Sequence, residues 1–180
     1  MSLLLANDVT AVADVRSVPA SQFTPQFNRE ALKRKLRENG IKYVFLGDEL
    51  GARSRDPSCY VDGRVQYDRL AGTDLFRNGI KRLRVGAATE SIAIMCAEQE
   101  PLDCHRTILV SRVLQNEGIH VTHIHADGRL ETHNEAMERL MKSFGLGEAD
   151  LFHDKQELVI QALKRQEEKI AFTAKTWTLT

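Results

Sequence analysis

Four short apolar runs, each followed by a helical pattern, constrain the fold of this chain more than any other feature. They cover residues 10–15, 41–46, 91–95 and 120–125. Each run has the length of a buried strand, and the segments between them are long enough for crossover connections. Strands that alternate with helices are typical of α/β proteins. We therefore expect a single compact α/β domain, with a mainly parallel sheet of about four strands flanked by helices.

Length and charge fit one such domain. The chain has 180 residues, enough for one well-buried core. We expect the whole chain, 1–180, to form it, with a core at about 9–145 and a C-terminal helix at about 154–171 that packs on the core or on a partner. Basic and acidic residues number 25 each, so the formal net charge is zero. No global field would attract nucleic acid or a membrane, and an anion site must come from a local group of basic residues.

The cysteine count and the hydropathy indicate the compartment. Three cysteines, an odd number, do not make a disulfide framework, so reduced thiols in the cytoplasm are expected. No apolar run is long enough to span a bilayer, and the first ten residues lack the basic region of a signal peptide. We expect a cytoplasmic protein without a membrane partner.

The segment "IAIMCAEQEPLDCHRT", residues 92–107, holds the residues best suited to chemistry. It follows the third expected strand, and working loops in parallel sheets lie beyond the carboxyl ends of the strands. Cys104, His105 and Arg106 stand where the next helix begins. A helix N-terminus and neighbouring cations lower the pKa of a thiol. A cation in a first helical turn opposes the helix dipole, so Arg106 should have an anionic partner: Asp14, Glu98, Glu100 or a bound anion.

These residues suggest an enzyme that acts on an anionic, phosphate-bearing substrate. Cys96 or Cys104 would be the nucleophile, and His105 or Glu98 would carry the proton. Asp14 would orient the site. The residues expected to bind the substrate are Arg16, Ser21, Arg53 and Arg106. Whether the chain is an enzyme stays open at this point, and the sequence names no cofactor.

Three alternatives remain. The order strand, cysteine, loop, arginine and helix also occurs in cysteine-dependent phosphatases, but nine residues separate Cys96 from Arg106 and no glycine lies between them.

Zinc would suit Cys96, Cys104 and His105. However, adjacent Cys and His residues rarely point the same way on a helix and no C-x-x-C is present, so we assign no metal ligands. A structural zinc or a redox thiol site is the weaker alternative.

The other alternative is a non-catalytic module that binds a nucleotide, a nucleic-acid end or a protein. Its stacking surfaces would be aromatic side chains, namely Phe23, Phe27, Tyr43 and Tyr60. The ligand would then be an anionic small molecule or a nucleic acid.

Four segments of the chain, in the same order, resemble the domain of unknown function 488 family. They are "DVRSVPASQFTPQFN", "GIKYVFLGDELGAR", "IAIMCAEQEPLDCHRTILVSRVL" and "GIHVTHI". The resemblance covers roughly residues 12–140, and the C-A-E-x(5)-C-H-R block is its most specific part. The characteristic positions that it implies are Asp14, Arg16, Pro19, Ser21, Phe27, Asn28, Tyr43, Gly51, Cys96, Glu98, Pro101, Cys104, His105 and Arg106.

The resemblance implies a compact α/β domain of the bacterial cytoplasm and supplies no reaction. Members of the family typically begin with a strand and an Ile-Gly-His-Ser-like turn before the Asp-Val-Arg block, and this chain starts almost at that block. We therefore expect the usual N-terminal strand to be lacking. An exposed sheet edge would then favour self-association, so a homo-oligomer is one expected partner state.

Overall fold

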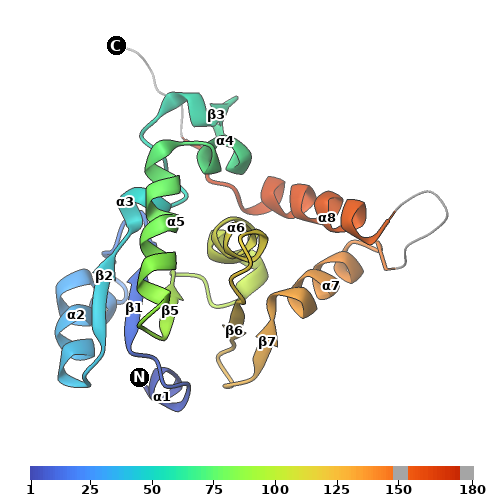
Figure 1. The fold of residues 1–180 in the computed structure, drawn as a ribbon. Helices are drawn as coiled ribbons and strands as arrows, with labels where there is room; N and C mark the ends of the chain where they lie inside the picture. Colours follow the sequence, from blue (N-terminus) through green and yellow to red (C-terminus); the bar gives the residue numbers. More distant parts are fainter. Residues whose placement is uncertain (148–153, 175–180) are drawn as a thin grey trace, which may run out of the picture.

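A parallel sheet of three strands forms the centre of the computed structural model, which describes residues 1–147 and 154–174 (Figure 1). The strands stand in the order β2-β1-β5, with β1 at Ala11–Asp14, β2 at Lys42–Phe45 and β5 at Ile92–Met95. Both neighbours pair with β1 in parallel. All four residues of β1 are buried, as its apolar sequence requires. The α/β class with a parallel sheet is confirmed.

The last expected strand lies outside this sheet. β6 (Thr122–Ile124) pairs antiparallel with β7 (Leu130–Thr132) in a separate hairpin. The turn between them contains Gly128 with a φ of 87°, a conformation that glycine adopts without strain. An Asp-Gly turn favours a local hairpin, so β6 finds its partner a few residues away rather than in the sheet.

The remaining described elements are short, apart from the four helices α2, α5, α7 and α8, which have 10 to 16 residues. The helices are α1 (Ser2–Ala6), α2 (Arg29–Glu38), α3 (Gly47–Leu50), α4 (Tyr67–Ala71), α5 (Asp74–Ala87), α6 (Arg112–Asn116), α7 (His133–Ser143) and α8 (Lys155–Ile170). Short 3-10 turns occur at η1 (Pro25–Phe27), η2 (Pro57–Cys59) and η3 (Pro101–Asp103), and a π-helical stretch, η4 (Arg106–Ser111), leads into α6. The strands β3 (Tyr60–Val61) and β4 (Arg64–Val65) form a second small hairpin.

Each face of the sheet has its own hydrophobic core. On one face, Val12 packs with Leu32 and Leu36 of α2. On the other face, Ala13 and Val15 belong to a larger core that includes residues of α5, η4, α7 and α8. The alternation of β1 side chains between the two faces explains why one short strand serves both cores.

The C-terminal helix packs on the chain's own core. Asp154 caps it, and its buried face includes Leu158, Ala162 and Leu163. Gln166, also buried, donates a hydrogen bond from Nε2 to the carbonyl of Leu102, 2.9 Å away. Helix α8 thereby holds the turn η3 in place. In the part of the chain that the structure describes, no helix has the length and apolarity needed to cross a membrane.

Gly47 marks a close approach of backbones beside the candidate site. A Cβ atom there would stand 2.1 Å from the carbonyl oxygen of Arg16, and backbone atoms cannot yield as a flexible side chain can. We therefore expect Gly47→Ala to lower the free energy of unfolding by about 2 kcal/mol or more. Urea denaturation measures this loss, and Gly147→Ala separates the clash from a general loss of glycine, since no atom of the described residues lies within 4 Å of a Cβ at position 147 and the backbone there has no positive φ.

Candidate functional site

Four side chains converge at the carboxyl end of β5. They are Cys96, Glu98, Cys104 and His105, and their ligand atoms all lie within 4.8 Å of one another. We call them the cysteine cluster. The Sγ of Cys104 donates to Oε2 of Glu98 at 3.1 Å, and Nδ1 of His105 lies 3.5 Å from Sγ of Cys96 and 3.9 Å from Sγ of Cys104. The strand end supplies one ligand atom, the loop supplies another, and the start of the next helix supplies two.

Cys104 and His105 point to one place because they differ in backbone conformation. Cys104 is extended, with φ −128° and ψ 138°, whereas His105 is helical, with φ −59° and ψ −26°. Our expectation that such neighbours diverge holds for two residues inside a helix. Cys104 stands just outside the helix, so the side chains of both residues reach the cluster.

The backbone of the first strand fixes the tautomer of His105. Nε2 of His105 lies 3.2 Å from the carbonyl oxygen of Val15, which can only accept a hydrogen bond. Nε2 therefore carries the proton, and Nδ1 directs its lone pair at the two sulfurs. A histidine held in this way is oriented as metal-ligating histidines are.

Among the described residues, Arg106 forms no ion pair with Asp14, Glu98 or Glu100, the three carboxylates expected as its partners. Its Nη1 and Nη2 atoms donate to the carbonyl oxygens of Glu98 and Gln99, at 2.6 and 3.3 Å. The guanidinium thus closes the loop that carries Glu98 and holds its backbone in place. Next to Arg106, the hydroxyl of Thr107 is fully buried and has no hydrogen-bond partner within the described residues. The helix start beside the cluster therefore keeps one unused polar atom.

Asp14 and Arg16 form a buried pair at the end of β1. Asp14 is completely buried, and Arg16 donates to its carboxylate from Nε at 2.8 Å and from Nη2 at 2.6 Å. The hydroxyl of Tyr43 donates to the same carboxylate at 2.7 Å. Burial raises the pKa of Asp14, but the hydrogen bonds from Arg16 and Tyr43 outweigh it and hold that pKa below its ordinary value. The pair is ionised and internally satisfied, and it frames the Val15 carbonyl that holds His105.

Two predicted binding residues have other contacts. The hydroxyl of Ser21 accepts a hydrogen bond from the N–H of Phe23 at 3.1 Å. The guanidinium of Arg53 lies over the ring of Phe172, 4.7 Å from its centroid. These contacts belong to loop structure, and a role for Ser21 or Arg53 in binding a substrate stays a prediction.

The cysteine cluster does not contain a simple activated thiol. The hydrogen bond between Cys96 and Cys104 and the burial of Cys96 both raise the pKa of the Cys96 thiol. Burial raises the pKa of Glu98 as well. Hydrogen bonds from Cys96 and Cys104 outweigh this effect, so the pKa of Glu98 lies below its ordinary value. In the chain alone, Cys96 is a neutral thiol beside a carboxylate, and a neutral thiol is a weak nucleophile.

A cavity of about 740 Å³ opens beside the cluster, and Cys96, Glu98 and Arg106 line one part of it. The rest of its lining comes mainly from β5, β6 and the apolar residues around them. Within the cluster, Cys104 is 1% exposed and His105 7%, whereas Glu98 is exposed. Glu98 is therefore the member that faces solvent and the cavity.

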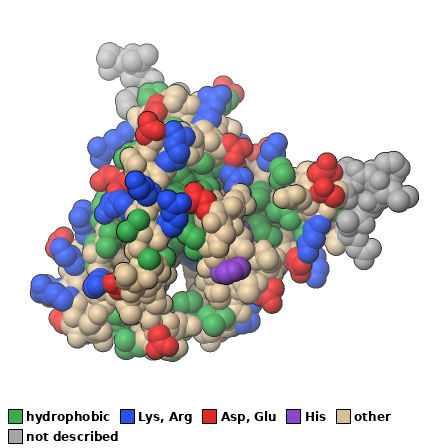
Figure 2. Space-filling model, in the orientation of Figure 1, with side chains coloured by type: hydrophobic (Ala, Val, Ile, Leu, Met, Phe, Trp, Pro, Cys, Tyr) green, Lys and Arg blue, Asp and Glu red, His purple; other side chains and the backbone are tan. Residues whose placement is uncertain are grey.

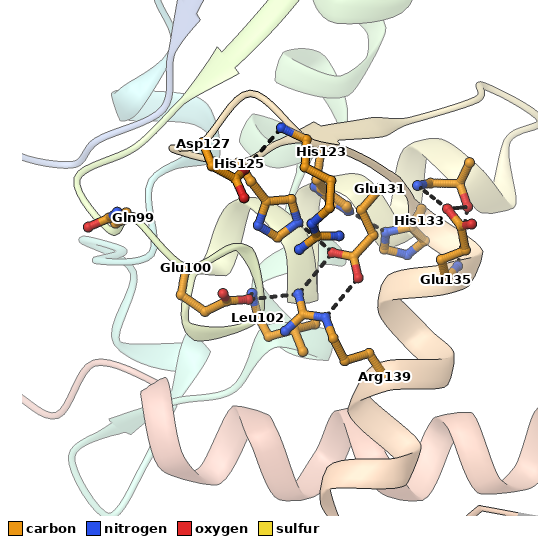
Figure 3. A network of polar contacts seen from close by, with 12 residues as sticks. Gln99, Glu100, Leu102, His123, His125, Asp127, Glu131, His133, Glu135 and Arg139 are labelled. Atoms are coloured by element: carbon orange, nitrogen blue, oxygen red, sulfur yellow. Dashed lines mark hydrogen bonds and ion pairs between the residues drawn. The ribbon is translucent and has the colours of Figure 1, made fainter. Parts of the chain in front are cut away.

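Sequence reasoning missed a polar network that joins α7, the β6–β7 hairpin and the loop after β5 (Figure 3). Arg139 of α7 donates to both carboxylate oxygens of Glu131, at 2.7 and 2.8 Å, and to Glu100 at 2.8 Å. His125 contacts Glu131 at 2.9 Å. Because Glu100 also accepts from the N–H of Leu102, the network ties the hairpin and α7 to the cysteine loop. Nothing in the sequence signals it, since the spacing of Glu100 and Arg139 fits no local motif.

Two histidines of this region are buried as a pair. Nε2 of His123 lies 3.2 Å from Nδ1 of His133, and both residues are buried (Figure 3). Burial lowers the pKa of each to about 4. At that distance one nitrogen donates to the other, which requires at least one neutral ring.

This pair predicts a loss of stability in mild acid. The folded-state pKa lies below the unfolded value of about 6.5, so the unfolded chain binds more protons and stability falls as the pH drops from about 6.5 towards 4. We expect the free energy of unfolding to be about 4 kcal/mol lower at pH 5 than at pH 7.5, about 2 kcal/mol for each histidine. Urea denaturation at both pH values measures it, and the double variant His123→Leu/His133→Leu should lose most of this dependence. An unchanged pH dependence in that variant would refute the assignment.

Fold and site together define the class of protein: an α/β protein with a cysteine, histidine and carboxylate cluster at the carboxyl edge of its parallel sheet. The family model of the domain of unknown function DUF488 matches residues 1–113, and the chain belongs to that family. The match includes the Asp14–Arg16 pair and the whole cysteine cluster. No curated protein and no solved structure was found to match the chain.

Proposed function

We propose that this chain binds a thiophilic divalent metal ion, for which zinc is the best match, at the cysteine cluster. The convergence of its four ligand atoms within 4.8 Å carries the proposal. Ligands around a tetrahedral zinc ion stand roughly 3.5 Å apart, given bonds of about 2.0–2.3 Å. A small contraction therefore brings all four onto one ion. Two sulfurs and an imidazole nitrogen make a soft donor set that suits zinc better than magnesium or calcium.

We propose further that the site is of the catalytic kind. Catalytic zinc sites hold three protein ligands firmly and keep one exchangeable position. Cys96, Cys104 and His105 would be the firm ligands, and Glu98 the exchangeable one, because it is the exposed member beside the cavity. A zinc ion there would act as a Lewis acid or activate a water molecule. Glu98, once displaced, would be placed to accept a proton.

An anionic, phosphate-bearing substrate remains the proposed substrate class. Arg106 supports it, since this cation lines the same cavity as Glu98 and Cys96. Arg16 supports it less, because its guanidinium is committed to Asp14. A cytoplasmic location is part of the proposal, and the three free cysteines are consistent with a reducing compartment.

A non-catalytic binding module is the second candidate, and one observation favours it. Phe23 is 85% exposed in the loop after β1, where a base or an apolar side chain could stack on it. Tyr43 is less suited to such a role, since its hydroxyl is bound to Asp14. Salt-sensitive binding of a single-stranded oligonucleotide that Phe23→Ala abolishes would favour this candidate over the enzyme.

Metal titration followed by an activity screen tests the leading proposal. The protein is stripped with a chelator and titrated with zinc by calorimetry, and we expect one ion per chain. The zinc-loaded protein is then screened against aryl phosphate mono- and diesters. Glu98→Gln should still bind zinc but lower the rate about a hundredfold, the usual effect of losing a general base. Absence of stoichiometric binding would overturn the metal site, and binding without hydrolysis would overturn the catalytic assignment for these esters.

A further inference from the structure

The central sheet ends at β5 on a cavity rather than on another strand. β5 pairs only with β1, and β6 only with β7, throughout the described residues. The cavity of about 740 Å³ lies between these two strands, and it is lined by all four residues of β5 and all three of β6. Figure 1 shows the separation of β5 from β6, and in Figure 2 the same face of the molecule is hollowed there.

Backbone hydrogen-bonding groups of β5 face this cavity. The N–H groups of Ala11 and Val15 donate to the carbonyls of Ser91 and Met95, at 3.2 and 3.0 Å. The direction of the backbone N–H and C=O groups alternates along a strand, so those of residues 91, 93 and 95 point towards β1. Ile92 and Ile94 therefore turn their N–H and C=O groups towards the cavity. The edge is a continuation of the ladder that already joins β1 to β5.

Apolar side chains from both hydrophobic cores line the cavity. Leu4 and Val12 belong to the small core on the α2 side of the sheet, whereas Leu83 and Leu114 belong to the large core on the other side. All four line the cavity. A molecule that fills it thus meets an apolar surface above and another below, with a strand edge between them.

We propose that the cavity between β5 and β6 binds an extended peptide segment as an added strand of the sheet. The segment would match the four residues of β5 in length, about 13 Å, and carry apolar side chains on both faces. Main-chain hydrogen bonds to the β5 edge give affinity, and the two apolar layers select the side chains. A fatty acyl chain would fit the apolar walls of the cavity. It would cover the backbone N–H and C=O groups of Ile92 and Ile94 without pairing them, which costs free energy.

The added strand would end beside the cysteine cluster. Cys96, Glu98 and Arg106 line the same cavity as the β5 edge. One end of the bound segment therefore lies next to the proposed metal site and contributes residues to its surroundings. The binding itself uses only the β5 edge and the apolar layers, so it does not depend on the metal.

Fluorescence anisotropy with a labelled model peptide tests this inference. The probe has five alternating valines and isoleucines between terminal lysines, and its control carries two prolines, which cannot donate to the ladder. We expect the probe to bind about tenfold or more tightly than the control. Hydrogen exchange should slow at the amides of Ile92 and Ile94. Equal binding of both peptides, or equal protection of these amides by dodecanoate, would overturn the proposal.

Matched tryptophan variants locate the binding. Thr122 is exposed and lines the cavity from β6, so Thr122→Trp should block the probe and weaken its binding about tenfold. Val61→Trp, on the exposed β3–β4 hairpin and absent from the cavity lining, should leave binding unchanged. In Cys104→Ser the probe should bind as in the wild type. If the protein binds the peptide but no metal, the peptide site is supported and the metal site is refuted. If it binds the metal but not the peptide, the metal site is supported and the peptide site is refuted.

Discussion

Replacing Cys104 with serine is expected to reduce bound zinc from one ion per chain to almost none. Cys104 is 1% exposed, and its sulfur lies 3.1 Å from Glu98 and 3.9 Å from His105, so it occupies the centre of the cluster. A serine hydroxyl stays protonated near neutral pH and is a poor zinc ligand, so the affinity should fall by about a hundredfold or more. Mass spectrometry of the metal content, together with calorimetric titration, measures the change.

Cys59 provides the matched control. It is the other fully buried cysteine, it lies in the large hydrophobic core, and it is not part of the cluster. Cys59→Ala should lower stability moderately and leave zinc binding intact. Equal loss of zinc in both variants would mean that general destabilisation, not ligation, explains the effect.

The largest loss of stability is expected from Asp14→Ala. Arg16 is 8% exposed, and the variant leaves its guanidinium without its carboxylate partner. An unpaired buried charge typically costs about 3–5 kcal/mol of the free energy of unfolding. Urea denaturation at neutral pH should show that loss. The hydroxyl of Tyr43 loses its acceptor in the same variant, which adds to the cost.

A double variant and a pH series separate the charge from the packing. Asp14→Ala/Arg16→Met removes both charges and should recover most of the loss. The pKa of Asp14 is lowered in the folded state, so its contribution is complete above the unfolded value of about 3.9 and is lost as the pH falls through the folded value. The difference between wild type and Asp14→Ala should therefore shrink in strong acid. A constant difference down to pH 2 would contradict the ion pair as its source.

Much of the fold could be predicted from local sequence patterns. The runs at 10–15, 41–46 and 91–95 contain β1, β2 and β5, and the α/β class followed from their alternation with helices. The fourth run was correctly placed as a strand, but its partner was not predictable in this way. A hydrophobic pattern shows that a strand is buried, whereas pairing depends on which edge is nearest once the helices have packed.

The residues of the cysteine cluster were singled out from the sequence, but their geometry was not predicted. The cysteines, His105 and Glu98 were singled out, and the structure brings them together. Their use as metal ligands was not assigned, because the extended backbone of Cys104 has no sequence signature. The partner of Arg106 was likewise unpredictable, since backbone carbonyls carry no residue identity. The network of Arg139, Glu131 and Glu100 depends on how α7 docks, which only the three-dimensional structure shows.

The contact between Val15 and His105 explains why two distant sequence blocks act together. The Asp-Val-Arg block supplies the carbonyl that orients the histidine, and the C-A-E-x(5)-C-H-R block supplies the cluster. Both lie within residues 1–113, the part that matches the family model. The buried Asp14–Arg16 pair holds the first block rigid, so it supports the cluster without touching its sulfurs directly. We expect this arrangement to be a property of the family rather than of this chain alone.

X-ray absorption at the zinc edge, recorded on the metal-loaded protein, identifies the atoms that bind the ion. We predict two sulfur scatterers at about 2.3 Å and two nitrogen or oxygen scatterers at about 2.0–2.1 Å. Glu98→Gln should keep both sulfurs. A spectrum with only nitrogen and oxygen neighbours, or with a single sulfur, would contradict the cysteine cluster as the metal site.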